Sequence, residues 1–129
     1  MAKLEINTDF DCDTGPLWAI VGDPSRADWV PSVSRCEYDG DCRTLTMAGA
    51  GEVVERIYNL DPQRRLIEYG VVESAAPLQR HRARIQLTPT ENGTRLQWHT
   101  EVLPDQYAEF IEQGMRAGID GLRQLLAAR

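Results

Sequence analysis

The sequence lacks any long run of apolar residues. No stretch approaches the roughly 18 consecutive apolar residues of a membrane-spanning helix. The first residues alternate polar and apolar types and lack the continuous hydrophobic stretch of a secretory signal. These absences predict a cytoplasmic protein that does not insert into membranes.

An excess of basic residues is also missing. The 14 Lys and Arg residues are outnumbered by 20 Asp and Glu residues, for a formal net charge of −6. Because affinity for a phosphate backbone comes mainly from clustered basic side chains, nucleic acid is not an expected partner. The one basic cluster, Arg80, Arg82 and Arg84, has the spacing of a single strand face and is interpreted as a solvated surface.

Cysteine and histidine are scarce. Cys12, Cys36 and Cys42 are an odd number without CxxC spacing, and His81 and His99 are the only two imidazoles. This composition favours neither a disulfide framework nor a metal site. The sequence contains no P-loop and no GxGxxG, so nucleotide chemistry is unsupported and we expect no cofactor.

What the 129 residues do contain is the pattern of one α+β domain spanning residues 1–129. Alternating segments predict a seven-stranded antiparallel sheet, with strands at residues 3–11, 34–39, 43–47, 52–61, 65–74, 78–88 and 94–103. Two short helices are expected between the first two strands. From about residue 105 onwards, apolar residues recur at three- and four-residue steps, which predicts a long amphipathic C-terminal helix.

The strand register indicates which side chains face the helix. If the more aliphatic face of each strand is the inner one, then Arg43, Glu55, Tyr69, Glu73 and His81 point inward among aliphatic residues. Because an unpaired buried charge is costly, these groups must pair with one another, reach water or face a cavity that holds a ligand.

The predicted helix carries Gly114 and Gly118 on its apolar face, where each glycine costs about 1 kcal/mol relative to alanine. Small residues there either leave space between helix and sheet or permit close helix packing. The sequence does not separate these two explanations.

The order of elements resembles the helix-grip architecture of the START-like, or SRPBCC, superfamily, and in particular its small bacterial polyketide cyclase/dehydratase family 2 domains. The resemblance covers almost the whole chain. Its residues are Leu17-Trp18-Ala19-Ile20-Val21-Gly22-Asp23, Trp29-Val30-Pro31, Cys36-Glu37, Arg43-Thr44-Leu45, Val54-Glu55-Arg56, Leu60-Asp61-Pro62, Tyr69-Gly70-Val71-Val72-Glu73-Ser74, Pro77 and Thr94-Arg95-Leu96-Gln97-Trp98.

The resemblance implies a curved sheet wrapped around the C-terminal helix, with a cavity between them for a hydrophobic, amphipathic or aromatic small molecule. We expect the protein to be a monomer or a homodimer. A shared fold restricts the type of ligand more than it restricts the reaction that a protein catalyses. The expected lining consists of Trp29, Arg43, Glu55, Tyr69, Glu73, His81, Trp98, Phe110, Gly114 and Met115.

Two functions fit these residues. In a cofactor-independent enzyme catalysing cyclisation, dehydration or isomerisation of a polyketide-like substrate, Arg43 would anchor the substrate and Tyr69 would stabilise negative charge. Glu73 or His81 would move the proton. In a non-catalytic carrier or sensor, the same groups would only orient the ligand.

Structural explanations remain for each of these residues. Arg43 can form an internal ion pair with a glutamate, and Tyr69 can be a core residue. His81 can bond to a backbone carbonyl. A filled barrel that serves only protein contacts is a third possibility.

Overall fold

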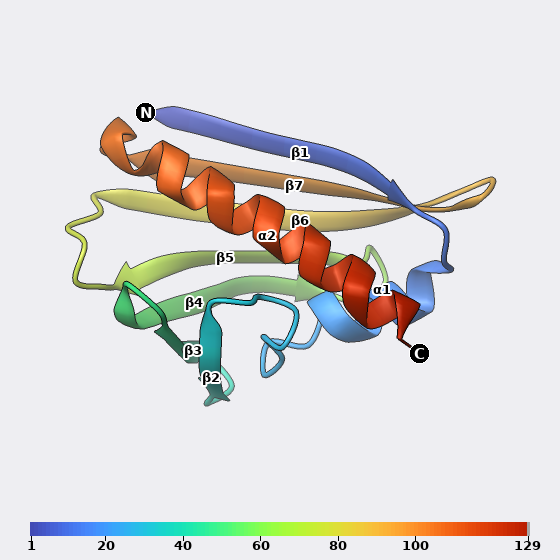
Figure 1. Ribbon diagram of the computed structural model, residues 1–129, viewed down its shortest axis with the longest axis horizontal. Helices are drawn as coiled ribbons and strands as arrows, with labels where there is room; N and C mark the ends of the chain where they lie inside the picture. The colour runs from blue at the N-terminus through green and yellow to red at the C-terminus, as the bar shows by residue number, and fades with distance from the viewer. Residues whose placement is uncertain (129) are drawn as a thin grey trace.

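The computed structural model describes residues 1–128 and contains one antiparallel sheet of seven strands in the order β1-β7-β6-β5-β4-β3-β2 (Figure 1). The elements are β1 (Ala2–Phe10), α1 (Thr14–Val21), β2 (Val33–Tyr38), β3 (Cys42–Met47), β4 (Gly51–Asp61), β5 (Leu66–Glu73), β6 (Arg80–Thr90), β7 (Gly93–Leu103), η1 (Asp105–Tyr107) and α2 (Ala108–Ala127). The predicted seven-stranded sheet and long C-terminal helix are confirmed, and the arrangement is a helix-grip fold.

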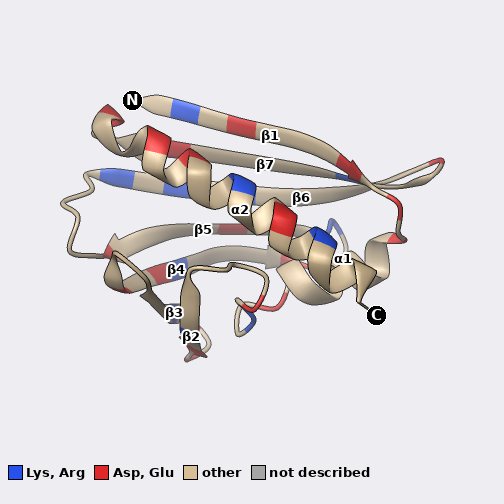
Figure 2. Ribbon diagram, in the orientation of Figure 1, with Lys and Arg blue, Asp and Glu red and all other residues tan. Residues whose placement is uncertain are grey.

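Helix α2 crosses one face of the sheet diagonally (Figure 1). Acidic and basic residues are distributed along the length of this helix (Figure 2). Its buried residues are Met115, Gly118, Ile119, Gly121 and Leu122, spaced as one helical face requires. Within residues 1–128, neither α-helix combines the length and hydropathy that a membrane crossing requires.

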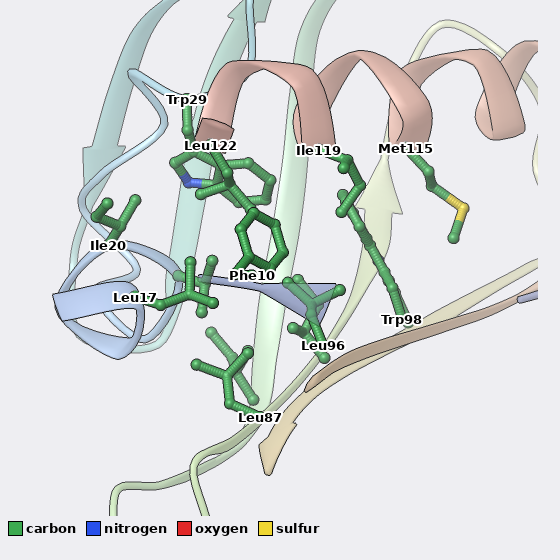
Figure 3. Packing of buried hydrophobic residues seen from close by; sticks show 14 of the residues in the cluster. Phe10, Leu17, Ile20, Trp29, Leu87, Leu96, Trp98, Met115, Ile119 and Leu122 are labelled. Carbon is green, nitrogen blue, oxygen red and sulfur yellow. The ribbon is translucent and has the colours of Figure 1, made fainter. Parts of the chain in front are cut away.

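The core lies between α2 and the sheet, and α1 closes one end of it (Figures 1 and 3). Leu17 of α1, Leu96 of β7 and Leu122 of α2 are fully buried, and Phe10 and Trp29 pack in the same cluster. Strands and helices far apart in the sequence therefore share one set of apolar contacts.

One short helix, rather than two, lies between β1 and β2. Residues 23–32 form turns, in which Asp23 Oδ1 accepts hydrogen bonds from both the backbone N–H and the hydroxyl of Ser25. Pro24 and Pro31 have no N–H to donate, so this segment cannot continue as a regular helix.

Two β-bulges interrupt the pairing of β4 with β5. Val54 pairs with Glu73 and Glu55 pairs with Val71, so Val72 is an extra residue on β5. A second shift leaves Tyr58 as an extra residue on β4. Because side chains alternate between the two faces of a strand, each extra residue reverses which residues beyond it face the helix.

Candidate functional site

A buried ion pair lies on the inner face of the sheet. Arg43 on β3 and Glu55 on β4 are cross-strand partners, and Arg43 Nε donates to Glu55 Oε1 at 2.7 Å. The two residues are only 6% and 8% exposed, and they are the only buried charged residues within 1–128. The expected inward direction of both side chains is therefore confirmed, and the arginine is paired with a glutamate.

The Arg43 guanidinium has a second contact, with the ring of Tyr69 on β5. Its Cζ atom lies 4.7 Å from the ring centroid, a cation–π distance. Burial by itself would lower the pKa of Arg43, but Glu55, Tyr69 and Cys36 together outweigh burial, with Glu55 contributing most, and the pKa is raised. Within the described chain, only Nε of Arg43 is hydrogen-bonded, so its two terminal NH₂ groups remain able to donate to a ligand.

Aromatic side chains continue the site from Tyr69. The indole N–H of Trp98 on β7 donates to the Tyr69 hydroxyl at 3.2 Å, and the Trp98 and Trp29 rings lie 5.6 Å apart with a 57° tilt. Burial, reinforced by the Glu55 carboxylate, raises the pKa of Tyr69, so its hydroxyl keeps its proton. These three residues form one aromatic wall beside the ion pair.

His81 on β6 lies just beyond the point where the backbone pairing of β5 with β6 ends. The pairing of β5 with β6 ends at Tyr69 and Ala83, and the next available N–H, that of Val71, donates to His81 Nδ1 at 3.1 Å. The sequence left a histidine–carbonyl bond as an alternative, and the structure instead has a bond in which the ring accepts. An accepting Nδ1 carries no proton, so the neutral ring carries its proton on Nε2. Burial lowers the pKa of His81, which favours the same neutral form.

The His81 contact predicts a pH effect on stability. Because the folded state has a lowered pKa, its stabilisation is present above about pH 6.5, the ordinary pKa of histidine, and is lost as the pH falls towards the folded value. Between about pH 7.5 and 5.5, the free energy of unfolding should decrease by up to about 1.4 kcal/mol through this group. In His81→Asn, the amide oxygen can still accept from Val71 and does not titrate. Urea unfolding should therefore show a smaller pH dependence in this variant, and equal slopes would contradict the assignment.

Arg43, Glu55, Tyr69 and His81 form the polar cluster of the inner face. Glu73 does not join the polar cluster, and the prediction that it points inward is wrong. The Val72 bulge shifts Glu73 into register with Val54, on the face opposite to Glu55, and its side chain is exposed. Simple alternation along residues 65–74 placed it with Tyr69 because a one-residue bulge leaves no clear mark in the sequence.

The three helix residues expected in the lining lie in different surroundings. Met115 is buried in the core, whereas Phe110 is 59% exposed and Gly114 is also exposed. A methyl group on Gly114 would meet no atom within 4 Å, but one on Gly118 would lie 3.0 Å from the Trp29 ring and 3.2 Å from the Trp98 ring. Gly118 thus permits close packing, whereas Gly114 leaves open space at the surface.

Two buried polar groups and one close contact between α2 and the backbone of Trp29 were not predicted from the sequence. Among the described residues, the indole N–H of Trp29 and the hydroxyl of Thr100 are buried without a hydrogen-bond partner. A side chain on Gly121 would overlap the backbone carbonyl of Trp29. The period-two register does place Thr100 on the inner face, but no sequence signal shows that its hydroxyl is unpartnered.

Two hollows open beside β1. One, of about 300 Å³, lies where β1 ends against the C-terminal part of α2, and the other, of about 390 Å³, lies along β1 and β7. The polar cluster lines neither of them. Within residues 1–128, no three His, Cys, Asp or Glu side chains are grouped as metal ligands.

Comparison with solved structures supports the fold. The protein XoxI from Bacillus cereus superposes with a TM-score of 0.86 at 18% identity, over 97% of this chain and 95% of that chain. A protein from Thermobifida fusca gives 0.79 at 24% identity, over 95% and 91% of the two chains. Ara h 8.0201 gives 0.80 at 13% identity over 99% of each. At these identities the likeness establishes the fold alone.

Sequence comparison identifies the family. Among curated proteins, none matches the chain. One family model, described as polyketide cyclase / dehydrase and lipid transport, matches residues 1–127, which is nearly the full length. The chain therefore belongs to the polyketide cyclase / dehydrase and lipid transport family.

Proposed function

We propose that this protein binds a hydrophobic or amphipathic small molecule between the inner face of the sheet and α2. The observation that carries the proposal is the buried Arg43–Glu55 pair on a largely apolar face. A buried ion pair adds little stability compared with apolar residues of similar volume. Its presence, next to Tyr69 and His81, is therefore better explained by recognition than by stability.

The cluster is suited to orienting an oxygen atom of the ligand. Arg43 has terminal N–H groups to donate, His81 has its Nε2–H, and Tyr69 keeps its hydroxyl proton. The Trp29–Trp98 wall supplies apolar and aromatic contact area. A few convergent polar groups in an apolar setting are typical of small-molecule sites.

Binding without chemistry fits these contacts better than cyclisation, dehydration or isomerisation. A catalyst of those reactions needs a group that takes up a proton. Glu73 lies on the opposite face, the Nδ1 lone pair of His81 is engaged by Val71, and Glu55 is paired with Arg43. We therefore favour a carrier or sensor, and catalysis through Arg43, Tyr69 and His81 is the second candidate.

Native mass spectrometry of freshly purified protein tests the proposal. We expect a co-purifying small molecule, or saturable binding of several members of a polyketide and isoprenoid panel. Absence of both would contradict a ligand-binding function. Turnover of a panel member would favour the second candidate over the carrier. His81→Asn would then test the role of His81, because a catalytic histidine predicts lost turnover with retained affinity.

A further inference from the structure

The charges of the polar cluster cancel. Arg43 and Glu55 are joined at 2.7 Å, and both side chains are about nine-tenths buried. Since they are the only buried charged residues within 1–128, no second buried cation is available beside them. The cluster therefore offers directed hydrogen-bond donors without net positive charge.

The remaining polar groups are neutral. His81 accepts the Val71 N–H at Nδ1, which leaves one proton, on Nε2. The Tyr69 hydroxyl accepts the Trp98 N–H, and burial, which raises its pKa, keeps its own proton in place. Thr100 on β7 adds a buried hydroxyl that has no partner among the described residues. It faces the helix beside Ala83, which pairs with Tyr69 on the next strand.

A ligand carboxylate would be poorly accommodated here. It would approach Arg43 but also the Glu55 carboxylate, so attraction and repulsion would be similar while the hydration of the carboxylate would be lost. An uncharged carbonyl oxygen loses much less hydration and accepts the same N–H and O–H groups.

We propose that the site selects ligands whose polar end is an uncharged carbonyl group, such as a ketone, and that Glu55 is the specificity-determining residue that rejects carboxylates. The proposal rests on the ligand-binding function proposed above and specifies its substrate class. Rejection by a like charge is a common route to specificity.

Two pairs of probes, matched in their apolar part, test the selection. They are 2-acetylnaphthalene with 2-naphthoate, and 2-tridecanone with dodecanoate, titrated calorimetrically at neutral pH below any micelle concentration. Whichever pair binds, the ketone should bind at least about tenfold more tightly than its acid. An acid that binds as tightly as its ketone would overturn the selection and leave the ligand-binding function standing.

Variants test the role of Glu55. Glu55→Gln keeps an oxygen able to accept from Arg43 and leaves the guanidinium unbalanced, so the preference should move towards the acid by at least about tenfold. Glu52→Gln, on the exposed part of the same strand, removes the same charge from the surface and should leave the preference unchanged. Equal shifts in the two variants would overturn the role of Glu55.

Two further results test the charge argument and the ligand-binding function on which it rests. Arg43→Gln combined with Glu55→Gln restores a neutral cluster and should restore the preference for the ketone, and a continued preference for the acid would contradict the charge argument. If neither pair binds and native mass spectrometry finds no co-purifying molecule, both the ligand-binding function and the selection built on it fail.

Discussion

Replacement of Arg43 by methionine is expected to lower the free energy of unfolding by about 3–5 kcal/mol. The substitution leaves the Glu55 carboxylate buried, 8% exposed, without its hydrogen-bonded counter-charge. It also removes the cation above the Tyr69 ring. The loss is a large fraction of the roughly 5–15 kcal/mol by which domains of this kind are usually stable. Equilibrium unfolding in urea, followed by circular dichroism, measures it.

Two controls separate burial from charge. Arg35 and Glu37 form an ion pair whose side chains are 72% and 61% exposed, so Arg35→Met should cost less than about 1 kcal/mol. Removal of both buried partners, in Arg43→Met with Glu55→Leu, should recover most of the stability, because no unpaired charge remains. A loss below about 1 kcal/mol for Arg43→Met would mean that Glu55 stays hydrated, which contradicts the buried pair.

Gly121→Ala is expected to destabilise the protein by about 2–3 kcal/mol, although alanine is the better helix former by about 1 kcal/mol. The added methyl group would overlap the Trp29 carbonyl oxygen. That oxygen belongs to the backbone, so it cannot move aside as the end of a flexible side chain would. Thermal and urea unfolding of the variant would show the loss.

Gly114→Ala is the matched control on the same helix. A methyl group at this position meets no atom within 4 Å, so the variant should gain about 0.5–1 kcal/mol from helix propensity and from a less flexible unfolded chain. If Gly121→Ala were at least as stable as the native protein, the close contact between α2 and Trp29 would be wrong, and a loss of stability in Gly114→Ala would contradict the open space at that position.

Whether the sequence predicts the direction of a site residue depends on whether its strand is regular or contains a bulge. In β3, β6 and β7, alternation holds, and Arg43, His81, Trp98 and Thr100 point inward as the period-two pattern requires. In β5 the pattern is correct as far as Val71, and Glu73 falls beyond the Val72 bulge. A bulge arises from the residue-by-residue pairing of two strands, so the composition of one strand alone does not predict it.

The hydrogen bonds of the site were less predictable than its residues. The sequence allowed an Arg43 pair with either glutamate, and it allowed His81 to donate to a carbonyl. Only the end of the β5–β6 pairing, after Tyr69 and Ala83, brings the Val71 N–H to His81 Nδ1. This contact determines the tautomer of the ring and thus which proton it can offer.

The sequence by itself determined the seven strands, the long amphipathic helix, the family resemblance and the apolar inner face, because these depend on periodicity and on turn residues along the chain. Tertiary structure decided which glutamate pairs with Arg43, which glycine of α2 is needed for close packing and how His81 is protonated. These properties depend on strand register and on distances between residues far apart in the sequence, and only the folded chain brings such residues together.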